Sequence, residues 1–386
     1  MLHFPRAEFD QRLRATRAEL KRRGLDGLLI FAQESHYYLT GFDSGGYKHF
    51  QCAVLTTDEK PITLLTRRPD LQQARRTSTI EDIRIWYNAE DENPARDLKA
   101  ILEEKGLRGA KLGVEMATYG LTGANWELLR KTLEGWCLLV DASPVVQLQR
   151  AIKSPAELEF VRKAAGLADD AVTAMLRTAR PGVPETVVLA AIHDAMLKGD
   201  GDVVGGPQIL GSGPKALLVR AATGRRTLGN DEQLTMEWAG IYRRYHTGIF
   251  RTVAIGKAKP QHKALFKLVE EALGAMTEAV APDQPLGRID EAHRRIFDAA
   301  GYREQRQWTA GYSLGATFAP RGLMDYPPML YADNPMPAKP GMVLFLHAVI
   351  SDERTESAMC LGHTILITPT GREVLSKLKL EYHELR

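Results

Sequence analysis

Residues able to carry chemistry gather within residues 236–252, which read MEWAGIYRRYHTGIFRT. This stretch predicts a β-hairpin in which an apolar strand contains Glu237, a basic turn follows, and a second strand begins near His246. Side chains two residues apart share a strand face, so if Gly248 faces a cleft, His246 and Phe250 face it too. Glu237 then faces the same cleft from the opposing strand. A carboxylate and an imidazole in one cleft suit proton transfer or metal binding.

Both groups also have a structural interpretation. A buried carboxylate is costly unless it is paired, so Glu237 could form an ion pair with Arg244 or Arg251. His246 could cap the turn of the hairpin. The sequence leaves these alternatives open beside the functional ones.

A second apolar strand is predicted over residues 343–350, and it carries His347 on the same face as Phe345. His347 is a candidate general base, because imidazole titrates near neutral pH; the alternative is a hydrogen-bonded histidine of the core. On the next strand, Gly362 and His363 have opposite parity. We therefore expect His363 to point away from the cleft.

Two more candidates lie in loop-like segments. Tyr312 follows a glycine in Gly-Tyr-Ser-Leu-Gly and could donate a hydrogen bond to a developing oxyanion, or simply pack. Arg220 could hold a carboxylate in bidentate fashion. Because Arg225 and Arg226 lie nearby, a solvated basic face is its alternative.

The elements that must position these residues fall into two regions. Residues 1–150 alternate short apolar strands with helical segments, which predicts a small α/β domain. Ser154-Pro155-Ala156-Glu157 is a capping box with proline in the first turn, so a long amphipathic helix is expected to open a second domain, 151–386.

The second region repeats itself at an offset of 101 residues: Pro181 and Pro184 recur as Pro282 and Pro285 inside matching helical patterns. Chance is the alternative. We expect an internally duplicated α/β (α+β) domain whose two halves form one sheet, with the site on the concave face between them.

Composition and charge argue against several classes of binding partner and of cysteine-based site. The net charge is only +3 and basic residues are spread along the chain, so neither nucleic acid nor an anionic membrane is an expected partner. The three cysteines form no CxxC pair, which argues against a zinc knuckle or a disulfide framework. The first residues lack the apolar core of a signal peptide, and a cytoplasmic protein is expected.

Several short motifs together resemble those of the creatinase/prolidase/methionine-aminopeptidase superfamily. They are Gly211-Ser212-Gly213-Pro214, Tyr245 with Arg251-Thr252, Gly311-Tyr312-Ser313-Leu314-Gly315 and Pro340-Gly341-Met342. The resemblance implies a creatinase-like N-terminal domain followed by a C-terminal domain with the pita-bread fold.

The resemblance also implies where the metallopeptidase members place five metal ligands, two Asp, one His and two Glu. In this chain those positions are Glu237, Gly248, Tyr312, His347 and Gly362, and none keeps the family residue. Hard divalent cations need several oxygen donors, so no dinuclear centre and no cofactor is expected. A rearranged mononuclear site of Glu237, His246 and His347 is the alternative.

The hairpin resembles most the metal-free branch, creatinase and ectoine hydrolase. Arg220 and Gly362 depart from that branch, which places a catalytic His and a Glu there. The expected activity is metal-independent hydrolysis of a C–N bond in a small nitrogen-containing zwitterion. His347, with His246 as substitute, would activate water, and Glu237 would pair with a cationic group of the substrate; Phe250 and Phe345 would contact it.

The same resemblance implies a homodimer in which the N-domain of one subunit borders the other's site. Tyr37 and Phe42, in an expected aromatic loop, would trim that site; an aromatic cluster of surface or core is the alternative. Two other functions remain open: a metal-dependent Xaa-Pro dipeptidase, and a non-catalytic protein that binds a small molecule.

Overall fold

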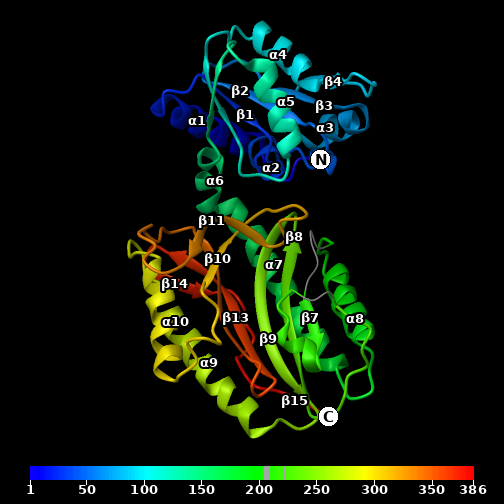
Figure 1. Cartoon of the computed structure of the whole chain (residues 1–386), viewed down its shortest axis with the longest axis vertical. Helices are drawn as coiled ribbons and strands as arrows, with labels where there is room; N and C mark the ends of the chain where they lie inside the picture. The colour runs from blue at the N-terminus through cyan, green and yellow to red at the C-terminus, as the bar shows by residue number, and fades with distance from the viewer. Residues whose placement is uncertain (204–208, 221–222) are drawn as a thin grey trace. The chain divides into compact units, whose positions relative to one another are not determined.

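The computed structural model describes residues 1–203, 209–220 and 223–386. The chain divides into two compact units, Met1–Arg150 (the N-terminal unit) and Ala151–Arg386 (the C-terminal unit), as Figure 1 shows. Among the described residues, no helix is both long and apolar enough to cross a membrane.

The N-terminal unit is a mixed sheet between two layers of helices. Its strands, in the order β4-β3-β2-β1-β5-β6, are β1 (Gly27–Ile30), β2 (Cys52–Thr56), β3 (Thr63–Arg67), β4 (Asp82–Trp86), β5 (Lys111–Val114) and β6 (Leu138–Asp141). Its helices are α1 (Arg6–Arg22), α2 (Gln33–Thr40), α3 (Leu71–Thr77), α4 (Pro94–Glu104), α5 (Gly123–Leu133) and α6 (Pro144–Ala151).

Strand alternation divides the core of this unit between the two faces of the sheet. Leu29 and Val54 pack with residues of α4 and α5, whereas the adjacent Leu28 and Leu55 pack with residues of α1, α2 and α6. Both faces of the central strands are therefore apolar, which explains why these strands read as continuous apolar runs in the sequence.

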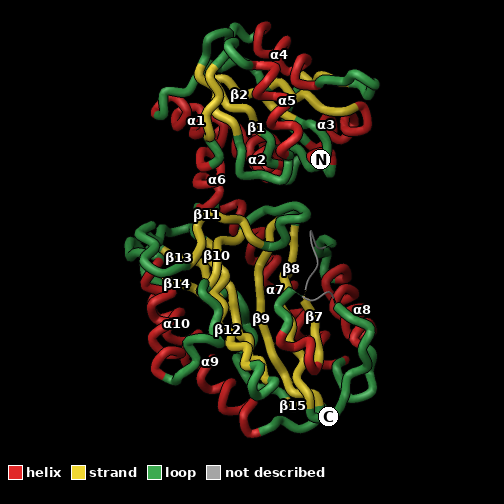
Figure 2. The backbone as a smooth tube through the Cα atoms, viewed as in Figure 1, coloured by secondary structure: helices red, strands yellow, loops and turns green. Residues whose placement is uncertain are grey.

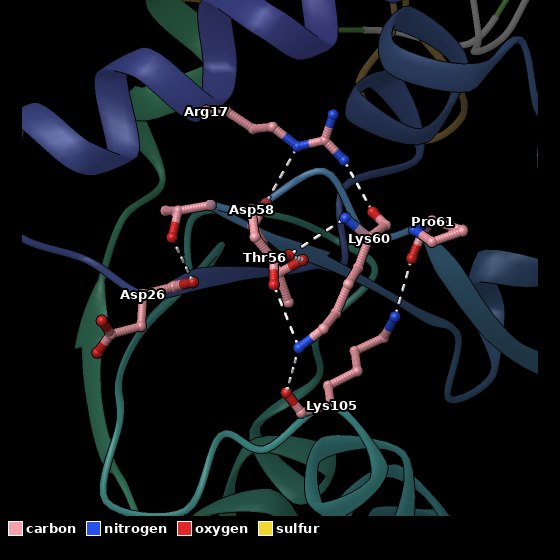
Figure 3. A network of polar contacts seen from close by, with 8 residues as sticks. Arg17, Asp26, Thr56, Asp58, Lys60, Pro61 and Lys105 are labelled. Carbon is pink, nitrogen blue, oxygen red and sulfur yellow. Dashed lines mark hydrogen bonds and ion pairs between the residues drawn. The ribbon is translucent and has the colours of Figure 1, made fainter.

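The turn between β2 and β3 is tied to two helices by the polar network of Figure 3. Arg17 of α1 donates through Nε to the carbonyl of Thr56 (3.1 Å) and through Nη2 to that of Lys60 (2.9 Å). Lys60 Nζ donates to the carbonyl of Lys105, at the end of α4, and Lys105 Nζ donates back to Pro61 O. Two lysines thereby satisfy carbonyls that the end of the helix and the turn would leave unpaired.

The segment expected to be an aromatic loop is instead helix α2, which Gly41 ends at a φ of 82°. Tyr37 and Phe42 are 1% and 0% exposed, and the Tyr37 hydroxyl lies 2.8 Å from His3 Nδ1. Phe42 packs in the core of the N-terminal unit. The expectation that these two side chains contact substrate is therefore wrong; the alternative of a core aromatic cluster describes them.

The C-terminal unit consists of two similar halves that share one sheet, antiparallel except where β15 pairs with β9 (Figures 1 and 2). The first contains α7 (Pro155–Thr178), α8 (Glu185–Lys198), β7 (Ile209–Ser212), β8 (Glu232–Tyr242) and β9 (Tyr245–Ile255). The second contains α9 (Pro260–Ala279), α10 (Gly287–Ala299), β10 (Gly311–Leu314), β11 (Met324–Leu330), β12 (Val343–Asp352) and β13 (Ser357–Thr368). Two short strands follow, β14 (Gly371–Val374) and β15 (Glu384–Leu385).

Each half buries the apolar face of its strands under its own pair of helices. Residues of α7 and α8 form one core with β8 and β9, and residues of α9 and α10 form another with β12 and β13. The halves join where β9 meets β13, with Phe250 opposite Gly362. The expected fold, a small α/β domain followed by a duplicated pita-bread domain, is confirmed.

The predicted capping box at the start of α7 is present. Ser154 Oγ accepts from the Glu157 amide, and the Glu157 carboxylate accepts from the Ser154 amide at 2.9 Å. The other carboxylate oxygen of Glu157 accepts a 2.7 Å hydrogen bond from the Tyr245 hydroxyl, which ties the first turn of α7 to the first residue of β9.

Candidate active site

The hairpin of β8 and β9 forms one wall of the site. Its two-residue turn, Arg243-Arg244, has positive φ at both positions (47° and 71°), the conformation that joins tightly twisted antiparallel strands. The turn is held by the Arg244 amide, which donates to Asp202 Oδ2 at 2.9 Å. The resulting register places Glu237 opposite Phe250.

A cavity of about 310 Å³ lies in the C-terminal unit, and Glu237 and Phe250 line it from the hairpin. Tyr312 of β10 and His347 of β12 line it from the second half of the unit, and Arg220 lines it from a turn after β7. The remaining lining residues are Ile209, Val219, Gln307, Thr309, Pro320, Arg321, Gly322, Leu323, Met324, Met329 and Val349. Five residues singled out from the sequence are thus brought together.

Glu237 is the acidic group of the cavity. Its Oε1 accepts a hydrogen bond from the Tyr312 hydroxyl at 3.2 Å. Burial raises the pKa of Glu237 to about 7, although the Tyr312 hydrogen bond and the positive charge of Arg220 both act to lower it. The carboxyl group therefore exchanges its proton near neutral pH. Arg251, its expected structural partner, instead donates to the carbonyls of Phe250 and Gly362.

His347 is the imidazole of the cavity. It is 8% exposed, and desolvation lowers its pKa to about 4, so the ring is neutral at pH 7. Its Nδ1 is buried and has no hydrogen-bond partner among the described residues. The ring centroid lies 5.7 Å from that of Tyr312. Nε2 is thus the nitrogen left for a ligand in the cavity.

Arg220 is exposed at the cavity rim, in a loop anchored from below by Glu185. Glu185 Oε1 accepts from the Ser212 amide at 2.9 Å, and Oε2 accepts from the Gly224 amide at 3.0 Å. Arg226 pairs with Glu232 at 2.7 Å, which engages this arginine elsewhere. Arg220 lines the cavity, and its positive charge acts on Glu237.

His246 is not at the cavity, contrary to expectation. It is 2% exposed; its Nδ1 lies 2.8 Å from the carbonyl of Arg244 and 3.2 Å from Thr317 Oγ1, and its amide donates to Gly315 O. The segment 315–317 covers the hairpin tip, where strand alternation alone suggested an open face. His246 therefore stabilises the turn, as in the alternative interpretation, and the expectation that it takes part in catalysis at the cavity is wrong.

Phe345 is also not a cavity residue, because it is fully buried and fills the space beside two glycines. A Cβ added at Gly248 would lie 2.9 Å from the Phe345 ring, and one added at Gly362 would lie 3.0 Å from it. No room for substrate is therefore left beside Gly248. The phenyl ring occupies the volume into which side chains at both glycine positions would project.

The position of the Phe345 ring also affects whether the metal centre that the fold implies could form. Of the five ligand positions, two are glycines backed by Phe345, and the donors that remain are Glu237, Tyr312 and His347. Nowhere in residues 1–203, 209–220 and 223–386 do three or more His, Cys, Asp or Glu side chains form a group able to hold a metal ion. The residues present do not fit a dinuclear centre, nor the rearranged site with His246.

Arg321 is a cavity residue that no sequence pattern predicted, and it lines the cavity from the segment between β10 and β11. Arg321 is 5% exposed, lies 5.1 Å from the Tyr326 ring centre and donates to the Tyr326 carbonyl at 3.3 Å. No periodicity placed this segment over the cleft. The Ala-Pro-Arg-Gly turn at 319–322 was the one signal that could have marked it.

Family models of known proteins match both units of the chain. The family model described as metallopeptidase family M24 matches residues 159–369, and the model described as the creatinase/prolidase N-terminal domain matches residues 12–152. The first match covers more than half of the chain. The protein belongs to the M24 metallopeptidase family.

Individual relatives span almost the whole chain. The ectoine hydrolase of Halomonas elongata is 27% identical over 391 residues, covering 97% of this chain and 96% of the relative. The Xaa-Pro dipeptidase of Pyrococcus horikoshii is 25% identical and covers 94% and 95%. Among solved structures, the prolidase of Thermococcus sibiricus superposes with a TM-score of 0.86 at 21% identity, covering 97% and 98%, a likeness of fold. The chain is a hydrolase of this family.

Proposed function

We propose that the protein hydrolyses a C–N bond, of amide or amidine type, in a small zwitterionic nitrogen compound, and that it does so without a metal ion. The observation that carries the proposal is the replacement of the family's ligand set by Glu237, Tyr312 and His347 around a cavity that Arg220 also lines. A relative named ectoine hydrolase, aligned over nearly the whole chain, supports the substrate class.

In this proposal Glu237 transfers the proton. A group whose pKa lies close to the working pH is deprotonated often enough to act as a base and is still basic enough to accept a proton. Glu237 meets this condition, because its pKa is raised to about 7. Tyr312 holds Oε1, so Oε2 is the oxygen that takes a proton from water. The water oxygen bonds to the substrate carbon, the C–N bond breaks, and Glu237 returns the proton to the departing nitrogen.

This assignment reverses the roles expected from sequence. His347 was the expected base, but a pKa of about 4 makes the neutral imidazole a weak one. His347 instead orients the substrate or the water through Nε2. Arg220, at the rim, binds the carboxylate of the zwitterion, and guanidinium–carboxylate pairing in two parallel hydrogen bonds would fix its direction in the cavity.

The test is a binding screen followed by product analysis. The chain, dialysed against a strong chelator, is scanned for thermal stabilisation by ectoine, creatine, other guanidino acids, betaines and Xaa-Pro dipeptides. Hits are incubated, and products are identified by mass spectrometry. Turnover of a zwitterion with the chelator present is the expected result. Glu237→Gln should lower it by about 100-fold or more, whereas Gly166→Ala, at an exposed position of α7 outside the cavity lining, should not.

Two rivals give different outcomes in the same experiment. A metal-dependent Xaa-Pro dipeptidase, favoured by the relative of that name, would need added Mn, Co or Zn and would hydrolyse the dipeptides. A non-catalytic binding protein would be stabilised by a ligand that stays intact. A homodimer and a cytoplasmic location remain predictions, to be checked by light scattering and by fractionation of the host cell.

A further inference from the structure

A second cavity, of about 180 Å³, lies on the opposite face of β9 from the proposed active site. Phe250 faces the active site, and the adjacent Arg251 and Val253 face this second cavity. Val172 and Leu176 of α7 form another wall. The C-terminal segment closes it with Leu378, Lys379, Glu381 and His383.

Arg251 is a charged residue in otherwise apolar surroundings. The residues that share its strand face, Ile249, Val253 and Ile255, belong to the apolar core under α7 and α8. Arg251 is 5% exposed, and the described part of the chain provides no ion-pair partner for it. Asp169 acts on it only at longer range.

The hydrogen bonds of Arg251 leave part of the guanidinium without an acceptor. Nη1 donates to the carbonyls of Phe250 (2.8 Å) and Gly362 (2.7 Å), across the seam between the two halves of the sheet. Within the described residues Nε and Nη2 donate to no acceptor. The carboxylate of Asp169 is engaged elsewhere, with Ser376 Oγ at 2.5 Å and the Lys377 amide at 2.7 Å.

A buried cation without a counter-ion is costly, and an anion in the cavity would offset that cost. Burial lowers the pKa of Arg251 to about 10, so the group keeps its charge at neutral pH. Lys379 and Glu381, both exposed, contribute one positive and one negative charge to the lining, so the buried charge of Arg251 is left without a counter-charge inside the cavity. The other walls are valine and leucine, which suit a short aliphatic chain.

We propose that this second cavity binds a small aliphatic monocarboxylate, with the carboxylate on Arg251 and the hydrocarbon between Val172, Leu176 and Leu378. The site is separate from the proposed active site and needs no activity there. The ligand shares Arg251 with the carbonyl of Phe250, a residue that lines the active-site cavity on the other face of the strand.

Isovalerate and its neutral isostere isovaleramide are the probes, measured against the full chain by calorimetry and by saturation-transfer NMR. The acid should bind at millimolar concentration or better, and the amide should bind at least about tenfold more weakly, because charge-assisted hydrogen bonds are lost. Leu176→Trp fills the cavity from a partly exposed helix position and should abolish binding. Arg220→Gln, at the first cavity, should leave it unchanged.

The proposal is overturned if isovalerate fails to bind the wild-type chain, if the amide binds equally well, or if binding survives Leu176→Trp. Loss of binding in Arg220→Gln with retention in Leu176→Trp would place the anion in the active site instead. Arg251→Lys, which keeps the charge but loses the fork geometry, should weaken binding. If that variant does not fold, the Leu176→Trp result decides.

Discussion

The hydroxyl of Tyr312 donates a 3.2 Å hydrogen bond to Oε1 of Glu237, and the two residues come from different halves of the duplicated unit. By the family resemblance, Tyr312 stands where the metallopeptidase members place a histidine ligand, and Glu237 stands where they place an aspartate ligand. The hydrogen bond stabilises the carboxylate form, while burial stabilises the carboxylic acid. Their balance leaves Glu237 titrating near neutrality, and this balance can be measured.

Replacing Glu237 by Gln should lower kcat by about 100-fold or more, the usual contribution of a positioned proton-transfer group. In the wild type, kcat/KM should fall as pH drops below about 7, because the base becomes protonated. Glu237→Gln should lose this acidic limb of the pH–rate profile as well as most of the rate. A pH–rate profile on the substrate found by screening measures both, and an unchanged limb in Glu237→Gln would assign the titration to another group.

Tyr312→Phe should move the same limb to higher pH. The Tyr312 hydroxyl lowers the pKa of Glu237, so removal of the donor raises that pKa. Folding should be preserved, since the ring packing against Phe345 is kept. A limb that stays in place while kcat falls would mean that Tyr312 acts on the substrate rather than on Glu237.

Gly248→Ala should lower the free energy of unfolding by about 1–3 kcal/mol, the usual cost of overpacking a core. The new Cβ would lie 2.9 Å from the Phe345 ring. Gly166→Ala is the matched control: it lies exposed in α7 with nothing within 4 Å of an added Cβ, and should stabilise by about 0.5–1 kcal/mol. Urea denaturation compares the two, and Phe345→Leu added to Gly248→Ala should recover part of the loss.

The wild type should lose stability as pH falls from about 6.5 towards 4, in part because of His246. Burial lowers the pKa of His246 to about 4, below the ordinary value of 6.5. Between these values the unfolded chain binds a proton that the folded chain does not, so acid favours unfolding. His246→Gln should make this dependence shallower by up to about 1.4 kcal/mol per pH unit across that window. Equal slopes in the two proteins would show that other groups dominate.

The sequence by itself determined the elements and the faces of the strands. Apolar runs and caps predicted the α/β unit and the start of α7, and a period of two correctly placed Glu237, Phe250 and His347 at one cavity. The same alternation predicted that His363 points away from the cavity. In the structure its Nε2 lies 2.9 Å from Thr277 Oγ1 of α9. These properties are local, because alternation follows from backbone geometry alone.

Only the tertiary structure decided what covers each face and how deeply each group is buried. The segment 315–317 removes His246 from the cleft, the ring of Phe345 fills the space beside two glycines, and Arg321 reaches the cavity from a segment without periodicity. Burial is also the reason why we propose Glu237 rather than His347 for proton transfer. Desolvation lowers the pKa of an imidazole and raises that of a carboxyl group, and desolvation depends on contacts between residues far apart in the chain.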